Sequence, residues 1–326
     1  MIKKLSIERF KSIRHLDIDC RRINLFIGEP NVGKSNILEA LGLLSWCASS
    51  GKSLKEFVRF QQTQQLFYDG LTDEPMRIVY QGEPAGEVTV KFERERFWFS
   101  SSAQASSQLA ILDFNGNQAP SQLLQGGEAF RFYRFRMLEK FDSGEPGTLI
   151  PPDGRNLFSV VYGSKGMREW LVELYRPYGL AVVMKPQEKA FELQKHQDGV
   201  VTAYPYVMSS DTLQRMLFYH AAMASNKNAV LIFEEPEAHA FPYYTKHLGE
   251  TIALGDTNQY FIATHNPYLL SAIVEKASKS DVAVFAACYR NFETQAKLLS
   301  DNQLSRLLDA DPFLGLELVL DDEVPA

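Results

Sequence analysis

The stretch Gly28-Glu29-Pro30-Asn31-Val32-Gly33-Lys34-Ser35 limits what this chain can fold into more than any other part of the sequence. It has the P-loop spacing GxxxxGKS, and it lies between an apolar run that ends at Ile27 and an apolar helix predicted over residues 36–48. The two glycines allow backbone angles in which consecutive N–H groups curl around a phosphate, and the next helix directs its positive end to the same point. The sequence therefore predicts a phosphate-binding loop between a strand and a helix.

The polar residues of this loop have distinct expected roles toward ATP and Mg²⁺, the cofactors that the loop predicts. Lys34 is expected to reach the β- and γ-phosphates, and Ser35 is expected to coordinate Mg²⁺ through its hydroxyl. The alternative is a chance glycine-lysine turn, which the flanking strand and helix disfavour. The other members of the predicted nucleotide-binding set in this region are Gly28, Asn31, Gly33 and Asn36.

Two carboxylates follow a continuous apolar strand predicted over residues 229–233. The carboxyl ends of parallel strands face the crevice in which a P-loop holds phosphate, so Glu234 and Glu235 are expected to point toward it. Glu234 is expected to hold the hydration shell of Mg²⁺, and Glu235 to orient and activate the attacking water. The alternative is that these acidic residues only cap the next helix.

Two further segments carry candidate site residues. His265 follows a strand predicted over residues 260–263, and this position favours a sensor of the γ-phosphate over a purely structural histidine. Ser209 and Ser210 open the helix that precedes the acidic strand, where helix capping is the default explanation for serine.

The periodicity predicts an α/β fold with one antiparallel region. From residue 206 onward helical and strand patterns alternate, which is typical of a parallel sheet with helices on its faces, whereas residues 76–136 have the short runs of an antiparallel meander. The expected organisation is a single domain over residues 1–326, with its core from 1–50 and 206–310, an antiparallel insertion at 51–150 and a mainly helical subdomain at 151–205. Expected strands cover 4–10, 23–27, 109–114, 130–137, 180–184, 191–193 and 282–287, and expected helices cover part of 54–74 and residues 156–161, 165–175, 212–224, 243–254 and 268–274.

Composition restricts the partners and the compartment. A net charge of −6 argues against attraction of nucleic acid to the whole surface, although the first 22 residues are basic and leave open a local DNA-binding patch or a solvated strand edge. Residues 130–136 interleave aromatic and basic side chains, which describes either a stacking surface for single-stranded nucleic acid or a strand with one wet face. No apolar run approaches the roughly 18 residues of a membrane helix, and three scattered cysteines indicate a reduced, cytoplasmic protein.

Taken together, these motifs resemble the ABC-type ATPase heads of the SMC, RecF and OLD-like group, including stand-alone bacterial members described as AAA-family or ABC-like ATP-binding proteins. The resemblance implies a P-loop NTPase fold, an ABC-type head with a mainly parallel core sheet, an antiparallel β meander and a helical signature subdomain. It also implies ATP held between two heads, with the signature serine of one facing the γ-phosphate of the other, and hydrolysis that reopens the dimer. The matching segments are Phe10 to Ile13, Gly28 to Asn36, Ser209 to Gln214 in the signature position, Phe233 to Glu237, and Thr264 to Pro267.

Three departures from the family pattern leave hydrolysis open. Glu234 stands where the usual residue is aspartate, and Asp211 stands where the signature glycine normally allows close approach to phosphate. No glutamine among residues 61–65 has the context of the family's Q-loop.

Two functions remain compatible with the sequence. The first is a slow Mg²⁺-dependent ATPase that dimerises on ATP and acts through a separately encoded partner in DNA maintenance or anti-phage defence. The second is a nucleotide-binding scaffold that does not hydrolyse ATP, since Glu234 and Asp211 are both unusual at their positions. A GTPase is disfavoured because no NKxD motif follows the P-loop.

Overall fold

The computed structural model describes residues 1–102 and 107–309, which form two compact units. Unit 1 consists of Met1–Phe132, Asn228–Glu235 and residues 249–309, and unit 2 consists of Tyr133–Lys227 and Pro236–Leu248. The core predicted for residues 206–310 is therefore divided, because residues 206–227 and 236–248 belong to unit 2. The sequence also predicts a loosely held acidic tail over the last fifteen residues, which lie outside the described residues.

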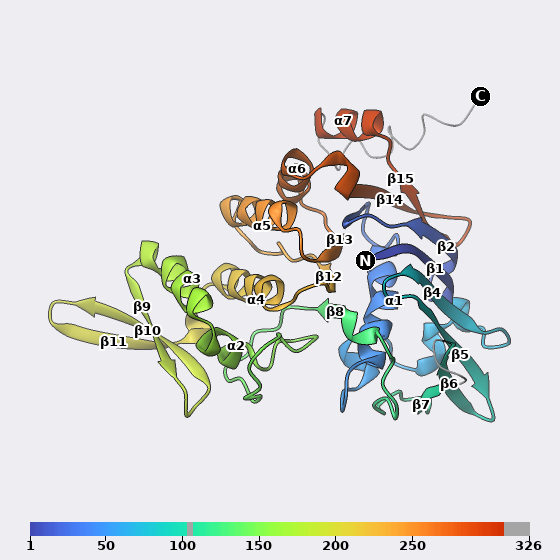
Figure 1. The fold of residues 1–326 in the computed structure, drawn as a ribbon, viewed down its shortest axis with the longest axis horizontal. Coiled ribbons are helices and arrows are strands. Elements are labelled where there is room, and N and C mark those ends of the chain that lie inside the picture. Colours follow the sequence, from blue (N-terminus) through green and yellow to red (C-terminus); the bar gives the residue numbers. More distant parts are fainter. Residues whose placement is uncertain (103–106, 310–326) are drawn as a thin grey trace. The chain divides into compact units, whose positions relative to one another are not determined.

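The central sheet of unit 1 is mainly parallel (Figure 1), with the strand order β15-β14-β3-β13-β12-β8. Strands β14, β3, β13 and β12 run parallel, and β15 pairs antiparallel with β14. Their apolar composition matches burial on both faces, and Phe26 of β3 stacks between Phe261 and Phe285 of the neighbouring strands. The bounds are β3 Ile23–Ile27, β8 Phe130–Tyr133, β12 Val230–Glu234, β13 Gln259–Ala263, β14 Val282–Arg290 and β15 Glu293–Leu298.

The second sheet of unit 1 is antiparallel and has the order β2-β1-β4-β5-β6-β7. Its strands alternate buried and exposed side chains, so one face is available for the core. The meander predicted within residues 51–150 is thus only part of this sheet, because β1 pairs with β4 and adds the N-terminal hairpin. The bounds are β1 Ile2–Phe10, β2 Ile13–Asp19, β4 Met76–Gly82, β5 Gly86–Glu93, β6 Arg96–Ser101 and β7 Ser107–Leu112.

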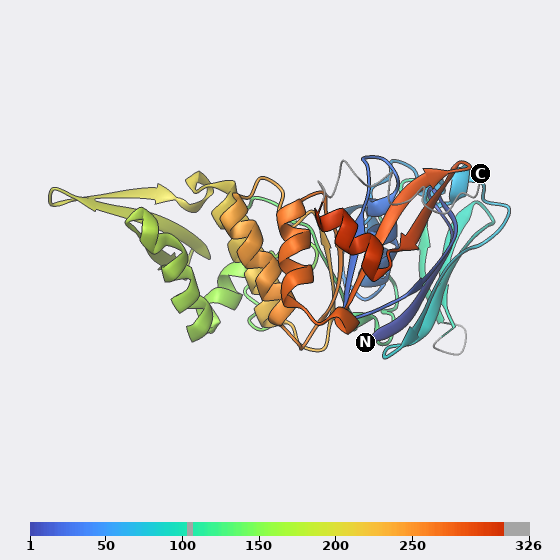
Figure 2. The same cartoon turned by 90° about the horizontal axis from the view of Figure 1, so that it is seen from above.

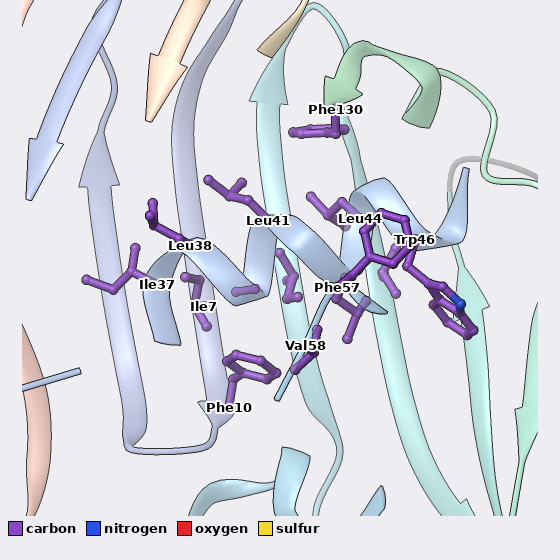
Figure 3. Close-up of a cluster of buried hydrophobic side chains, with 14 of the residues drawn as sticks. Ile7, Phe10, Ile37, Leu38, Leu41, Leu44, Trp46, Phe57, Val58 and Phe130 are labelled. Carbon is purple, nitrogen blue, oxygen red and sulfur yellow. The ribbon is translucent and has the colours of Figure 1, made fainter. Parts of the chain in front are cut away.

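Helix α1, Lys34–Cys47, joins the two sheets into one core (Figure 3). It is buried on nearly every side, and its apolar side chains contact β1 of the antiparallel sheet and β12 and β13 of the parallel sheet. Ile37, Leu41, Leu44 and Trp46 are fully buried, and each such side chain contributes on the order of 1.5–3 kcal/mol relative to exposure. This burial fixes the start of α1, and hence the P-loop, against the carboxyl ends of the parallel strands.

Unit 2 combines helices with a three-stranded antiparallel sheet of order β11-β10-β9. The prediction of a mainly helical segment at 151–205 was wrong in this respect, because β9 and β10 are longer than the expected strands and β11 was not expected. Helix α3 lies beside β9, and β10 and β11 form an extended hairpin (Figure 2). The bounds are α2 Leu157–Gly163, α3 Lys165–Tyr175, β9 Leu180–Lys185, β10 Ala190–Gln197, β11 Val200–Pro205, α4 Asp211–Ser225 and α5 Pro242–Leu254, of which residues 242–248 belong to this unit.

Other differences from the sequence predictions concern short or polar segments. The strand expected over 130–137 is the shorter β8, which belongs to the central sheet instead of a second meander. Residues 54–70 form three short 3₁₀ turns instead of a helix, and β15 and α7, Asp301–Asp309, were not expected because both are largely polar. Helix α6 covers Pro267–Lys276. None of the helices within residues 1–102 and 107–309 is both long enough and apolar enough to span a bilayer.

Candidate nucleotide-binding site

The P-loop requires glycine at both ends because two strands approach it closely. A Cβ on Gly28 would lie 2.4 Å from the carbonyl oxygen of Ala287 on β14, and a Cβ on Gly33 would lie 1.9 Å from Thr294 Oγ1 on β15. Both glycines also have positive φ, +148° and +94°. The loop is thus shaped by steric contacts with the β14–β15 hairpin as well as by its own backbone.

Lys34 lies at the first turn of α1 with its ammonium group turned toward the loop. Its Nζ donates to the carbonyl oxygens of Gly28, at 2.8 Å, and Glu29, at 2.6 Å. Burial lowers the pKa of Lys34 to about 8, against the opposing effect of the Glu235 and Glu29 carboxylates. The loop therefore holds a buried cation that is largely protonated at neutral pH.

Ser12, Asn36 and Thr294 form a small polar cluster next to the P-loop. The hydroxyls of Ser12 and Thr294 are 2.6 Å apart, and Asn36 Nδ2 donates to Ser12 Oγ at 2.6 Å. Thr294 is fully buried, and its backbone N–H donates to the Ser12 carbonyl. These bonds fasten the β1–β2 turn and β15 to the start of α1, whereas no side chain caps the helix itself.

The Glu234 carboxylate at the end of β12 is part of a charged network. Arg59 Nη2 lies 2.7 Å from Glu234 Oε1, and Arg59 Nε lies 2.7 Å from Glu39 Oε1 on α1. Glu39 is fully buried and also pairs with Lys11, whose Nζ donates to the carbonyl oxygen of Arg59 at 2.6 Å. Arg59 and Glu39 belong to no recognisable sequence motif, so the sequence analysis did not identify them as candidate site residues.

Glu235 and His265 come from adjacent strand ends and meet. His265 Nε2 lies 3.1 Å from Glu235 Oε1, and both side chains are partly exposed. The hydrogen bond with His265 lowers the pKa of Glu235, helped by the charges of His265, Lys34 and Arg59, while burial opposes the shift. Glu235 also has a positive φ of 44°, which is strained for this residue type and is typical of functional positions.

The predicted signature residues lie in unit 2, and they are tied into that unit. Ser209 Oγ is 2.8 Å from the Tyr175 hydroxyl, and Ser210 is the N-cap of α4, accepting a hydrogen bond from the N–H of Leu213. The carboxylate of Asp211 pairs with Arg215 one turn later in α4. The negative charge that stands in the glycine position is thus compensated within its own helix.

The predicted metal ligands offer the chemistry that Mg²⁺ prefers. The hydroxyl of Ser35 and the carboxylate of Glu234 are hard oxygen donors, and Mg²⁺ is commonly held by one or two such groups together with water and phosphate oxygens. Within residues 1–102 and 107–309, no cluster of three or more His, Cys, Asp or Glu side chains forms an all-protein metal site. The donor set therefore fits a cation that shares its ligands with a bound nucleotide.

Two proposed nucleic-acid features look different in the structure. Phe130, Phe132 and Tyr133 are buried, so the aromatic residues of β8 do not form an exposed stacking surface. Several basic residues of the first 22 are engaged in ion pairs or hydrogen bonds with the protein: Lys4 with Asp19, Arg9 with Glu74, Lys11 with Glu39, Arg21 with backbone carbonyls, and Arg22 with Asp281. A DNA-binding patch at this end of the chain stays a prediction.

A family model and solved structures of other proteins are similar to this chain. A family model described as an AAA ATPase domain matches residues 1–97. The solved structure of an Smc head bound to the C-winged helix domain of ScpA aligns over 93% of this chain and 99% of its own, with a TM-score of 0.54 at 15% identity. A Pyrococcus furiosus Smc head with an extended coiled coil, bound to the C-terminal domain of ScpA, aligns over 94% and 98% with the same TM-score at 14% identity. The fold is that of the solved Smc heads.

Curated relatives match only part of this chain. The DNA replication and repair protein RecF of Bacteroides fragilis is 29% identical over 83 residues, which is 24% of this chain and 22% of RecF. RecF of Leptospira interrogans is 28% identical over 100 residues, or 29% of this chain and 27% of the relative. The matched regions thus span about a quarter of each relative.

The alignments with the Smc heads confirm the predicted fold class of an ABC-type head with a mainly parallel core sheet.

Proposed function

We propose that this head binds ATP with Mg²⁺ and hydrolyses it slowly, as a switch that dimerises on ATP. The observation that carries the proposal is the Glu235–His265 pair, 3.1 Å apart, whose carboxylate interacts electrostatically with the P-loop Lys34. The lowered pKa of Glu235 keeps its carboxylate ionised at neutral pH, and in this form it orients and activates the attacking water. His265 fixes this carboxylate and acts as the sensor of the γ-phosphate.

The other residues of the site have supporting roles in the proposal. Lys34 binds and orients the β- and γ-phosphates, and the N–H groups at the start of α1 add the positive end of the helix. Ser35 and Glu234 hold Mg²⁺, which when bound neutralises phosphate charge. Gly28, Asn31, Gly33 and Asn36 shape the loop around the phosphates, and Ser209 and Ser210 are proposed to reach the nucleotide of a second head.

The relatives support the proposed partner and pathway. Solved Smc heads of this fold are bound to domains of ScpA, and this supports a separately encoded protein partner for the present head. RecF is named for DNA replication and repair, which supports a function in DNA maintenance. The proposal of a role in anti-phage defence is based on the sequence resemblance to stand-alone members of the group. The proposal of a cytoplasmic location is based on the need for ATP.

The decisive experiment compares wild type with Glu235→Gln by light scattering and phosphate release, each with and without Mg-ATP. Glutamine keeps the size of the side chain but accepts no proton, so we expect the variant to accumulate a dimer and to release phosphate at least about 100-fold more slowly. Lys34→Ala is expected to bind no ATP and to stay monomeric. Glu275→Gln, on the exposed surface of α6, is the matched control. Wild-type turnover in Glu235→Gln would remove Glu235 from the proposed role.

A second function, a scaffold that binds nucleotide without hydrolysis, is favoured by one specific contact. Arg59 pairs with Glu234 at 2.7 Å, so a guanidinium already occupies the carboxylate that would hold the metal. If this pair persists in the nucleotide complex, ATP binds without a productively held Mg²⁺. The same experiment separates the two functions, because a scaffold gives an oligomer that does not respond to nucleotide and no phosphate release in any variant.

A further inference from the structure

The turn between β14 and β15 has an unusual residue in an unusual conformation. Arg290 pairs with Glu293, so Asn291 and Phe292 form a two-residue hairpin loop, and both have positive φ, 53° and 65°. Such turns strongly favour glycine at the second position, because a side chain is strained there. The chain nevertheless has phenylalanine, and 79% of its surface is exposed to solvent. Neither turn formation nor core packing accounts for Phe292.

This turn lies beside the phosphate-binding loop. The carbonyl of Ala287 approaches Gly28, and the hydroxyl of Thr294 approaches Gly33, so the hairpin borders the loop at both glycines. Tyr289 is paired directly opposite Thr294, and opposed residues of an antiparallel pair project from the same face. Tyr289 therefore extends from the face that touches the P-loop, and about half of its surface is exposed, 49%.

A third aromatic residue supports the turn. The hydroxyl of Tyr68 donates to the carbonyl oxygen of Phe292 at 3.0 Å and so connects the turn to the segment that follows β1 and α1 in unit 1. The hydrogen bonds between Ser12, Thr294 and Asn36 fasten the same hairpin to the start of α1. These hydrogen bonds therefore stabilise the hairpin that carries the two exposed aromatic residues beside the P-loop.

We propose that Phe292 and Tyr289 form a platform on which the purine base of the nucleotide stacks. This inference rests on the proposed ATP binding, because the P-loop must hold the phosphates for the base to reach the platform. A hairpin that carries two exposed aromatic residues and borders a phosphate-binding loop matches the two chemical parts of a nucleotide, a flat aromatic base and a polyanion. Aromatic residues stack on bases with little preference for base identity, so the platform supplies affinity, and not selection between purines.

The chain offers a variant that tests the platform without harming the fold. Asn-Gly is the preferred sequence for a two-residue turn with positive φ at both positions, so Phe292→Gly should leave the Tm unchanged or raise it. We expect Phe292→Gly and Tyr289→Ala each to bind Mg-ATP about tenfold more weakly in calorimetric titration. Inorganic triphosphate with Mg²⁺, which has no base, should bind wild type and both variants equally. Leu254→Ala removes a similarly exposed apolar side chain, 72% exposed, at the end of α5 and should change neither affinity.

The outcomes separate this proposal from the proposed function. ATP affinity equal to wild type in Phe292→Gly and in Tyr289→Ala would overturn the platform while leaving ATP binding intact. An equal loss of triphosphate binding would also overturn it, because the variants would then act on the phosphates. Failure of the wild-type protein to bind either ligand would instead remove the proposed function, and the platform with it.

Discussion

At the scale of single residues, Lys34 combines a buried position with a positive charge that the proposed function needs. Burial disfavours its protonated form and lowers its pKa to about 8, so small changes of pH above neutrality alter its charge. Only the protonated form attracts phosphate. The apparent dissociation constant for Mg-ATP should therefore rise as the protonated fraction of the free protein falls.

This argument gives a pH dependence of nucleotide affinity with a definite sign. For a pKa of about 8, we expect Mg-ATP to bind about fourfold more weakly at pH 8.5 than at pH 7, because most Lys34 is then neutral before binding. Binding at pH 8.5 should also take up a proton, which calorimetry in buffers of different ionisation enthalpy measures. Lys34→Arg keeps its charge throughout this range, so its affinity should be independent of pH. A wild-type affinity that is constant from pH 7 to 9 would contradict the pKa of about 8.

The site residues that sequence reasoning found are those whose position follows from a motif and a strand end. Lys34 is fixed by the P-loop spacing, and Glu235 and His265 follow adjacent parallel strands, so their proximity was predictable from strand order. Arg59 and Thr294 reach the same site from a 3₁₀ turn region and from an antiparallel edge strand. Their contacts depend on tertiary packing that no local pattern in the sequence encodes. The nucleotide roles of all these residues stay predictions.

At the scale of elements, the buried carboxylate of Glu39 connects three parts of unit 1. It lies on α1, pairs with Lys11 in the β1–β2 turn and with Arg59 after the first 3₁₀ turn, and accepts the backbone N–H of Arg59. A fully buried carboxylate is tolerated only when such partners compensate its charge. Removing that charge leaves two cations facing an apolar helix.

Glu39→Gln should accordingly destabilise the protein by about 2–3 kcal/mol. This is less than the cost of breaking a fully buried ion pair, because the side chain of Arg59 is more than half exposed. Urea unfolding followed by circular dichroism measures the change as a lower midpoint with an unchanged slope. Glu275→Gln on the exposed face of α6 is the matched control and should stay within about 0.5 kcal/mol of wild type. Equal midpoints for Glu39→Gln and wild type would show that the network contributes nothing to stability.

Elements with strong periodicity were predictable, and those defined by distant pairing were not. Helix α1 and strands β12, β13 and β14 have long apolar patterns and lie close to the residues expected for them. By contrast, β8 has an alternating pattern that suits either sheet, and only its partners place it in the central one. In β11 every side chain is exposed, so this strand has no alternation of burial, and pairing with β10 determines it.

At the scale of the whole molecule, two compact units with different buried ionisable groups are expected to respond differently to acid. In unit 2 the rings of His220 on α4 and Trp170 on α3 stack with their centroids 3.9 Å apart and their planes within 3°. Burial lowers the pKa of His220 to about 4, and the nearby His247 adds to this effect. His220 is therefore neutral in the folded unit at pH values where a free histidine is charged.

The sign of the resulting pH dependence follows from proton uptake on unfolding. Between pH 6.5 and about 4, His220 binds a proton in the unfolded chain but not in the folded unit, so stability falls as the pH is lowered through this window. The variant His220→Phe keeps a ring against Trp170 but cannot be charged. As the pH falls from 7 to 4, we expect its free energy of unfolding to decrease less than that of wild type, with a difference of up to about 3 kcal/mol at pH 4. Urea unfolding between pH 7 and 4, followed by circular dichroism, measures this difference. His196→Gln on the exposed part of β10 should behave as wild type, and parallel pH profiles for His220→Phe and wild type would show that His220 titrates normally in the folded protein.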